Sequence, residues 1–155
     1  MTKTVKTRYA SIDDAPQIAG LLDKYRVFYG QEPAPTESLE FVKERFYLGE
    51  SVVIVASEDD QIIGFTQLFP SFSSVTLQRL WILNDLYVEE SKRHLGVGKL
   101  LLEAAKGLAK QTNAKELFIE GADNNPRARK IYTSFGFIEN KDYHYYHLPV
   151  TSQKD

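Results

Sequence analysis

Residues 93–99, RHLGVGK, have the composition of a loop that binds an anion. Glycines that precede a helix let backbone N–H groups approach a phosphate closely, and the helix dipole adds to the attraction. Two common anion loops do not fit, because Leu101 stands where the dinucleotide fingerprint needs a third glycine and Leu100 where the P-loop needs Ser or Thr. What remains is the pattern R-x-x-G-x-G, from Arg93 to Gly98. Alone it is a weak signal, because glycine pairs serve turns in many proteins.

A second pattern lies in residues 125–137, NPRARKIYTSFGF. It reads N-x-x-A-x-x-x-Y-x-x-x-G-F, with its fixed positions at Asn125, Ala128, Tyr132, Gly136 and Phe137. One expected amphipathic helix, 97–111, and one expected strand, 115–120, separate the two patterns. Two motifs in a consistent order of elements are more specific than either motif alone.

The elements that position these motifs follow from apolar periodicity and turn residues. We expect a strand at 5–11, helices at 13–30 and 36–49, and strands at 51–57, 62–70 and 79–90, with 71–78 ambiguous. After helix 97–111 and strand 115–120 we expect a helix at 128–135 and strands at 135–139 and 143–150. Strands cluster in the middle of the chain and alternate with helices later, which favours a mixed α/β sheet over a doubly wound parallel one.

The composition is that of one globular domain, with 155 residues, 43% hydrophobic, 26% charged and a formal net charge of -2. We assign residues 1–150 to that domain and 151–155 to a short polar tail. The absence of cysteine excludes a disulfide scaffold, a thiolate nucleophile and a cysteine-ligated metal. No apolar stretch approaches membrane-spanning length and no secretory signal is visible, so we expect a cytoplasmic protein without a membrane partner. No metal site is expected, because His144 and His147 face opposite sides of an expected strand.

Charge is divided unevenly along the chain. Residues 31–60 hold eight acidic side chains against Lys43 and Arg45, whereas the segments 92–99 and 127–130 are locally basic. An acidic surface attracts a cationic substrate, and the basic segments suit an anion. The mildly negative net charge disfavours broad nucleic-acid binding.

Together the two motifs resemble those of the GNAT superfamily of acyl-CoA N-acetyltransferases, and the expected order of elements is similar to the family's over essentially the whole chain. The resemblance implies a GNAT fold, a mixed α/β sheet of about seven strands, mostly antiparallel and then parallel, flanked by four helices. It implies acetyl-CoA as co-substrate, with the pyrophosphate at R-x-x-G-x-G and the pantetheine along the central strand, where a bulge at 86–88 would separate that strand from its neighbour. The residues that it assigns to the co-substrate are Leu86, Tyr87, Val88, Arg93, His94, Leu95, Gly96, Val97, Gly98, Lys99, Asn125, Arg127, Ala128 and Tyr132.

A narrower similarity, to polyamine, diamine and other small-amine acetyltransferases, covers segments 84–98 and 124–137. Those enzymes carry an acidic pair before the apolar triplet of the central strand, whereas here Asn84 takes the first position and Asp85 keeps the second. The resemblance makes Asp85 the first choice as general base, with Glu120 or an ordered water as alternatives, or else a group that only holds the substrate cation. Tyr132 is the candidate general acid, because the usual pKa of tyrosine, about 10, is close to that of a thiol, about 8.5. The expected substrate-binding residues are Tyr25, Phe28, Tyr29, Asn84, Asp85 and Glu120.

The leading hypothesis is an enzyme that moves an acetyl group from acetyl-CoA to the primary amine of a small molecule, such as a polyamine, a diamine or an amino-acid derivative, by direct attack in a ternary complex. One alternative is acetylation of a protein or peptide. Another is an acyl-CoA-binding sensor without turnover. Tyr132 argues mildly against this alternative, and Asn84 argues mildly for it. A homodimer is expected from the family's habit and from the exposed edge that aromatic C-terminal strands would leave.

Overall fold

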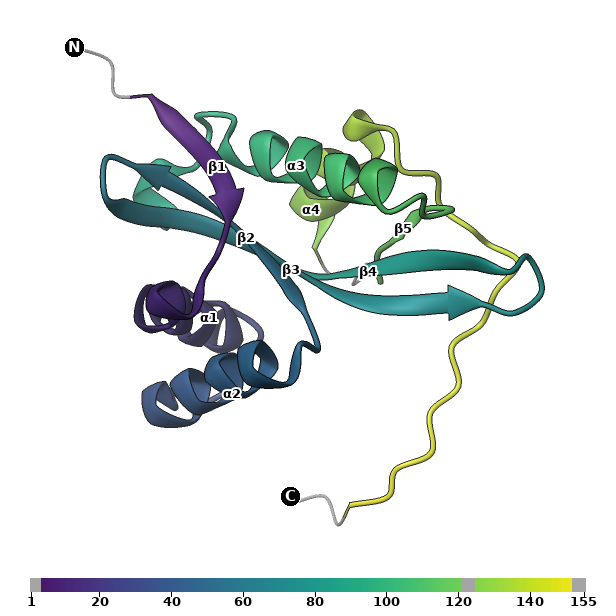
Figure 1. The fold of residues 1–155 in the computed structure, drawn as a ribbon, viewed down its shortest axis with the longest axis horizontal. Coiled ribbons are helices and arrows are strands. Elements are labelled where there is room, and N and C mark those ends of the chain that lie inside the picture. The colour runs from purple at the N-terminus through teal and green to yellow at the C-terminus, as the bar shows by residue number, and fades with distance from the viewer. Residues whose placement is uncertain (1–3, 121–124, 152–155) are drawn as a thin grey trace. The chain divides into compact units, whose positions relative to one another are not determined.

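The structure is a computed structural model that describes residues 4–120 and 125–151. The chain divides into two compact units, residues 1–120 and 121–155. The described part of the first unit holds a five-stranded sheet and three α-helices, and that of the second unit holds one α-helix (Figure 1).

The sheet of the first unit has the strand order β1-β2-β3-β4-β5. Its strands are β1 (Val5–Tyr9), β2 (Val52–Glu58), β3 (Gln61–Ser73), β4 (Gln78–Val88) and β5 (Leu117–Phe118). The first four strands pair antiparallel, and β5 pairs parallel to β4. The mixed α/β fold class predicted from the sequence is therefore confirmed.

Helices cover both faces of this sheet. α1 (Ala15–Phe28) and α2 (Pro35–Leu48) lie against one face, and α3 (Val97–Gln111) lies against the other (Figure 1). The buried core on the first face joins both helices to the sheet through residues such as Phe65 and Tyr87. No helix in the described part of the chain is both long and apolar enough to cross a membrane.

Local sequence signals set the ends of the helices. α1 begins just after Asp14 with proline in its first turn, and α2 ends at Gly49, which is in the left-handed conformation. Gly96, also left-handed, precedes α3. The three helices match the predicted ranges within two residues at each end, and the ambiguous segment 71–78 is divided between the end of β3, a turn and the first residue of β4.

The sequence prediction of about seven strands was too high for the described residues. The strand expected at 115–120 is only Leu117–Phe118, and no strand forms at 135–139 or 143–150. Alternating apolar residues indicate which face of a strand would be buried, but a strand forms only where a neighbour takes up its N–H and C=O groups. In the second unit the described regular element is α4 (Pro126–Phe135), the helix predicted at 128–135.

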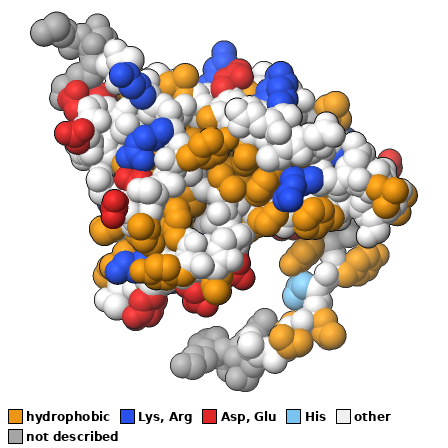
Figure 2. All heavy atoms as spheres, in the orientation of Figure 1, with side chains coloured by type: hydrophobic (Ala, Val, Ile, Leu, Met, Phe, Trp, Pro, Cys, Tyr) orange, Lys and Arg blue, Asp and Glu red, His pale blue; other side chains and the backbone are white. Residues whose placement is uncertain are grey.

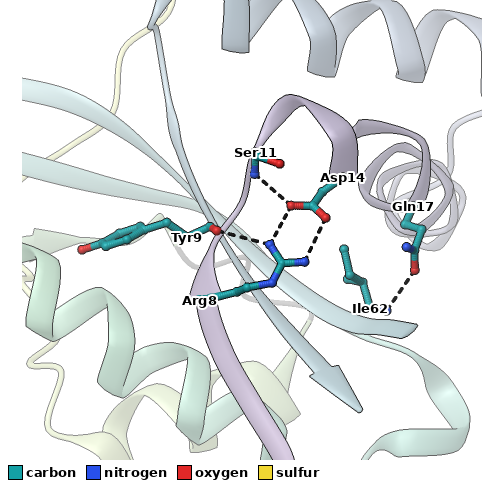
Figure 3. A network of polar contacts seen from close by, with 6 residues as sticks. All are labelled: Arg8, Tyr9, Ser11, Asp14, Gln17 and Ile62. Atoms are coloured by element: carbon teal, nitrogen blue, oxygen red, sulfur yellow. Dashed lines mark hydrogen bonds and ion pairs between the residues drawn. The ribbon is translucent and has the colours of Figure 1, made fainter. Parts of the chain in front are cut away.

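An ion pair between Arg8 of β1 and Asp14 fixes the start of α1 (Figure 3). Arg8 donates to both carboxylate oxygens of Asp14 at 2.7 and 2.9 Å, and the N–H of Ser11 donates to the same carboxylate at 2.8 Å. One turn further along α1, Gln17 accepts a hydrogen bond from the N–H of Ile62 at 2.9 Å. The hydrogen bonds from Arg8 are the largest cause that lowers the pKa of Asp14 from 3.8 to about 2. These contacts attach α1 to the sheet.

We expect Asp14→Asn to lower the stability of the protein near neutral pH and much less in strong acid. Because the pKa of Asp14 is lower in the folded than in the unfolded protein, the ion pair stabilises the fold above pH 3.8, and this contribution is lost as the pH falls towards about 2. Since the Arg8 side chain is half exposed, the expected loss of unfolding free energy is about 1 kcal/mol.

Urea unfolding of the wild type and the variant across this pH range measures the difference. Asp13→Asn, at the exposed neighbouring position, is the matched control. Equal losses in the two variants, or a loss for Asp14→Asn that does not depend on pH, would contradict the assigned ion pair.

Candidate active site

The central strand β4 separates from β5 halfway along its length. β4 pairs with β3 from Gln78 to Val88, but its pairing with β5 is confined to Trp81 and Ile82. Within the described residues, the edge of β4 that faces β5 therefore has no paired strand over residues 83–88. The expected pantetheine-binding residues Leu86, Tyr87 and Val88 lie in this stretch. Backbone groups on such an open edge are available to an extended ligand.

A β-bulge lies within this stretch, before Leu86. Leu83 is opposite Leu68 and Asp85 is opposite Gln67, so Asn84 is one extra residue in β4. The resemblance led us to expect a bulge at 86–88 that would separate β4 from its neighbour. The observed bulge lies two residues earlier and belongs to the pairing of β4 with β3. β4 separates from β5 because the pairing of these two strands ends at Ile82.

Asp85 is a buried carboxylate held by three neighbours. Its side chain accepts hydrogen bonds from Gln67 Nε2 at 2.6 Å and from Asn84 Nδ2 at 3.2 Å, and its backbone carbonyl accepts one from Thr66 Oγ1 at 2.8 Å. Only 5% of Asp85 is exposed. Burial raises the pKa of Asp85, and the hydrogen bonds from Gln67 and Asn84 oppose that rise. A buried acid with a perturbed pKa is the kind of group that proton-transfer sites use.

Aromatic side chains of α1 lie next to the bulge. The Tyr25 hydroxyl donates to the Asn84 carbonyl oxygen at 3.4 Å, and the Tyr25 ring makes edge contacts with Tyr29 and Tyr87 at centroid distances of 4.9 and 6.1 Å. Phe28 contacts Tyr29 in the same way at 5.1 Å, and Phe28 is 61% and Tyr29 46% exposed. The structure thus links the predicted substrate residues Tyr25, Phe28 and Tyr29 to the strand that carries Asp85.

Glu120 is the predicted substrate residue that the structure leaves apart from this group. It lies two residues beyond β5, its side chain is exposed, and no contact with Asp85 is found in the described part of the chain. Gln67, in contrast, was not identified from the sequence. The available signal was a glutamine in the otherwise apolar strand segment 62–70, and its importance became visible only with the register that places it opposite Asp85.

The glycine loop leads from β4 into the first turn of α3. Gly96 is the residue before the helix, with φ 78° and ψ 12°, and it has no side chain to cap the helix. The N–H groups of Val97, Gly98 and Lys99 therefore have no acceptor within α3, because the first turn of a helix lacks preceding carbonyls. His94 also has a positive φ of 69°. The loop presents backbone donors at the positive end of the helix dipole, as the pattern R-x-x-G-x-G predicts.

Charged residues before the glycines attach this loop to the rest of the unit. Glu89 accepts hydrogen bonds from Lys24 of α1 at 3.0 and 2.9 Å, and Lys92 pairs with Glu58 of β2 at 2.9 Å. Arg93 donates through Nε to the Val88 carbonyl at 3.0 Å, and its guanidinium lies over the Tyr87 ring. Lys92 and Arg93 thus make contacts within the first unit. They help to position the loop and also give it positive charge.

The motif of the second unit is a helix with both ends capped. The Asn125 side chain accepts a hydrogen bond from the N–H of Ala128 at 3.2 Å, which makes it the N-cap of α4. Gly136, with φ 120°, ends the helix, and the N–H of Phe137 returns to the Tyr132 carbonyl at 3.0 Å. The Phe137 ring then packs edge-on against Tyr132 at 5.8 Å. Arg127 projects from the first turn with an exposed side chain.

Comparisons with known proteins agree with this geometry. The model of the acetyltransferase (GNAT) family matches residues 18–137. The chain is 41% identical over 146 residues to the uncharacterized N-acetyltransferase YhfO of Bacillus subtilis (strain 168), covering 94% of this chain and 98% of that protein. The crystal structure of a probable acetyltransferase is similar with a TM-score of 0.89 at 38% identity, covering 96% of this chain and 99% of that one. An aminoglycoside N-acetyltransferase in complex with CoA shares the fold, with a TM-score of 0.78 at 19% identity, covering 96% of this chain and 97% of that one.

The fold and these matches define an acyltransferase enzyme. The chain belongs to the acetyltransferase (GNAT) family, whose enzymes use acetyl-CoA.

We expect alanine at Gly96 and at Gly98 to change stability in opposite directions. Gly96 has a positive φ, so a Cβ there costs about 1 kcal/mol. Gly98 lies inside α3 without a positive φ, and nothing lies within 4 Å of the position that a Cβ would take. Alanine there favours the helix by roughly 0.5 to 1 kcal/mol. Thermal and urea unfolding measure both variants, and equal changes in the two would contradict the described loop conformation.

Proposed function

We propose that this enzyme transfers the acetyl group of acetyl-CoA to a primary amine of a small molecule, such as a polyamine, a diamine or an amino-acid-like compound. The observation that carries the proposal is the buried Asp85 carboxylate in the part of β4 that has no β5 partner. Its neighbour Asn84 accepts a hydrogen bond from Tyr25, which also contacts the exposed ring of Tyr29. A carboxylate attracts an ammonium group and can accept its proton, and aromatic faces bind organic cations. The combination suits an amine better than a neutral or anionic acceptor.

Two features of the first unit support acetyl-CoA as the co-substrate. The backbone N–H groups from His94 to Lys99 suit the pyrophosphate, because α3 begins there without a side-chain cap. The open edge of β4 at Leu86, Tyr87 and Val88 suits the pantetheine amides. The residues of the second unit proposed to bind the same co-substrate are Asn125, Arg127, Ala128 and Tyr132. The family match runs through both units, which supports treating residues 1–150 as one domain.

The chemistry requires two proton movements that this chain can serve. The ammonium group first loses one proton to give the neutral amine. As the amine nitrogen then forms its bond to the acetyl carbon, the bond from that carbon to sulfur breaks, the nitrogen loses its second proton to solvent and the departing thiolate gains one from the protein. Asp85 is proposed to accept the proton of the ammonium group, with Glu120 or a water as the alternative base. Tyr132 is proposed to donate to the thiolate. A backbone N–H of the open β4 edge stabilises the charge that develops on the carbonyl oxygen.

The surface around α2 supports a cationic acceptor. Glu37, Glu40 and Glu44 of this helix are exposed, and Figure 2 shows acidic side chains over this region of the visible face. Negative charge near a site raises the local concentration of a cation. Two further parts of the proposal, a cytoplasmic location and a homodimer, rest on the sequence alone.

The direct test is release of CoA thiol from acetyl-CoA with polyamines, diamines, amino acids, aminoglycosides and short peptides as acceptors. We expect release with small amines, and a loss of about 100-fold or more in kcat for Asp85→Asn and for Tyr132→Phe. Tyr47→Phe, at an exposed position on α2, is the control that should leave kcat unchanged. Release with peptides alone would indicate a protein acetyltransferase. Binding of acetyl-CoA without release for any acceptor would indicate a sensor.

A separate test addresses the co-substrate site. We expect Gly98→Ala to weaken acetyl-CoA binding by about tenfold, because a methyl group added in the proposed phosphate loop would hinder the close approach of backbone donors to phosphate. Gly107→Ala, on the same helix and equally free of close neighbours, is the matched control and should not change the affinity. Calorimetric titration measures both, and equal affinities for the two variants would exclude the start of α3 as the phosphate site.

A further inference from the structure

The two oxygens of the Asp85 carboxylate are held by two different amide side chains. Gln67 donates to one oxygen at 2.6 Å, and Asn84 donates to the other at 3.2 Å. Gln67 is 3% exposed and stands directly opposite Asp85 in the β3–β4 register. A side-chain amide has a neutral donor and brings no charge of its own, so it can stabilise a buried carboxylate without adding an ion.

The bulge makes this arrangement possible. The extra residue in β4 is Asn84 itself, whose side chain reaches its neighbour Asp85 while its carbonyl accepts a hydrogen bond from Tyr25. Thr66, the neighbour of Gln67 on β3, donates to the Asp85 backbone carbonyl. Asp85 is thus fixed at its backbone and at both side-chain oxygens, and rotation of the carboxylate would break at least one of these hydrogen bonds.

We propose that Gln67 is a positioning residue which, with Asn84, holds the Asp85 carboxylate in one orientation and stabilises its ionised form. This inference rests on the proposed role of Asp85 as the base. Gln67 acts only through Asp85 and has no assigned contact with the amine. An exposed residue, Asn84, makes the longer bond, and the buried residue, Gln67, makes the shorter one, so Gln67 has the larger effect.

Other titratable groups packed at this face belong to both α1 and β4. They are Tyr25 and Tyr29 of α1 and Tyr87 of β4, while the charged groups Lys24, Glu89 and Arg93 make the contacts of the glycine loop. Gln67→Met substitutes none of these residues, so a shift in the titration of Asp85 that Thr66→Val does not reproduce reports the loss of the amide.

The test uses Gln67→Met, which keeps the length of the side chain and removes the donor. Burial already raises the pKa of Asp85, and removal of a hydrogen bond to the anion raises it further. We expect the acid limb of the pH profile of kcat/KM to move up by about one to two pH units. Thr66→Val is the matched control, because it removes an equally buried hydrogen bond to Asp85 at the backbone and leaves the carboxylate contacts in place.

Carbon NMR of aspartate-labelled protein gives a second readout that does not depend on turnover. The Asp85 carboxyl signal is assigned as the one missing from Asp85→Asn, and its titration should move upwards in Gln67→Met but not in Thr66→Val. If the Gln67 variant does not fold, Asn84→Ala, at an exposed position, should give a smaller shift in the same direction.

The outcomes separate the two proposals. If Asp85→Asn leaves the pH profile of turnover unchanged, Asp85 is not the base and the positioning role in catalysis is overturned with it. If Asp85→Asn removes the acid limb but Gln67→Met leaves both the limb and the NMR titration in place, the role of Asp85 stands and the inference about Gln67 is wrong. Equal shifts in Gln67→Met and Thr66→Val would also overturn it, because they would indicate general disturbance of the fold.

Discussion

The candidate site depends on one constraint, the unequal pairing of the two edges of β4. On one edge β4 pairs with β3 from Gln78 to Val88, with the bulge at Asn84 as the interruption. On the other edge β5 leaves after two residue pairs, so the backbone over 83–88 has no strand partner in the described part of the chain. An unpaired backbone edge inside a protein is costly unless something else satisfies it. In the proposed function, the extended amides of the co-substrate serve that purpose.

Several weak contacts connect the elements around this edge to one another. Lys24 attaches α1 to Glu89, Lys92 attaches the loop to β2 through Glu58, and Arg93 returns to the end of β4. Exposed ion pairs contribute about 0 to 1 kcal/mol each, so these pairs say little about stability. Their value is geometric, because they attach α1, which carries the aromatic side chains, and the loop before α3 to the strands of the sheet.

Local features of the fold were predictable and distant ones were not. The end of α2 at Gly49, the start of α3 after Gly96 and the capped helix α4 are local features. Each depends on residues within one or two turns, and sequence patterns report such signals directly. The strands expected near the C-terminus needed partners that apolar alternation cannot specify. Gln67 was missed for the same reason, because only the β3–β4 register and the bulge show that it faces Asp85. The glycine loop was recognised by its spacing, but the attachments of Lys92 and Arg93 were not.

Asn84, at the position where the sequence analysis looked for a second acid, suits the electrostatics of the buried Asp85 beside it. A second carboxylate next to Asp85 would repel its charge and raise its pKa beyond the rise that burial already causes. An amide in that place donates a hydrogen bond instead and lowers the cost of the anion. With Gln67 on the other oxygen, one acid is stabilised by two neutral donors. With Asn84 in place of a second acid, proton transfer would go through Asp85 alone. The presence of Asn84 is therefore a weaker argument for a protein without turnover.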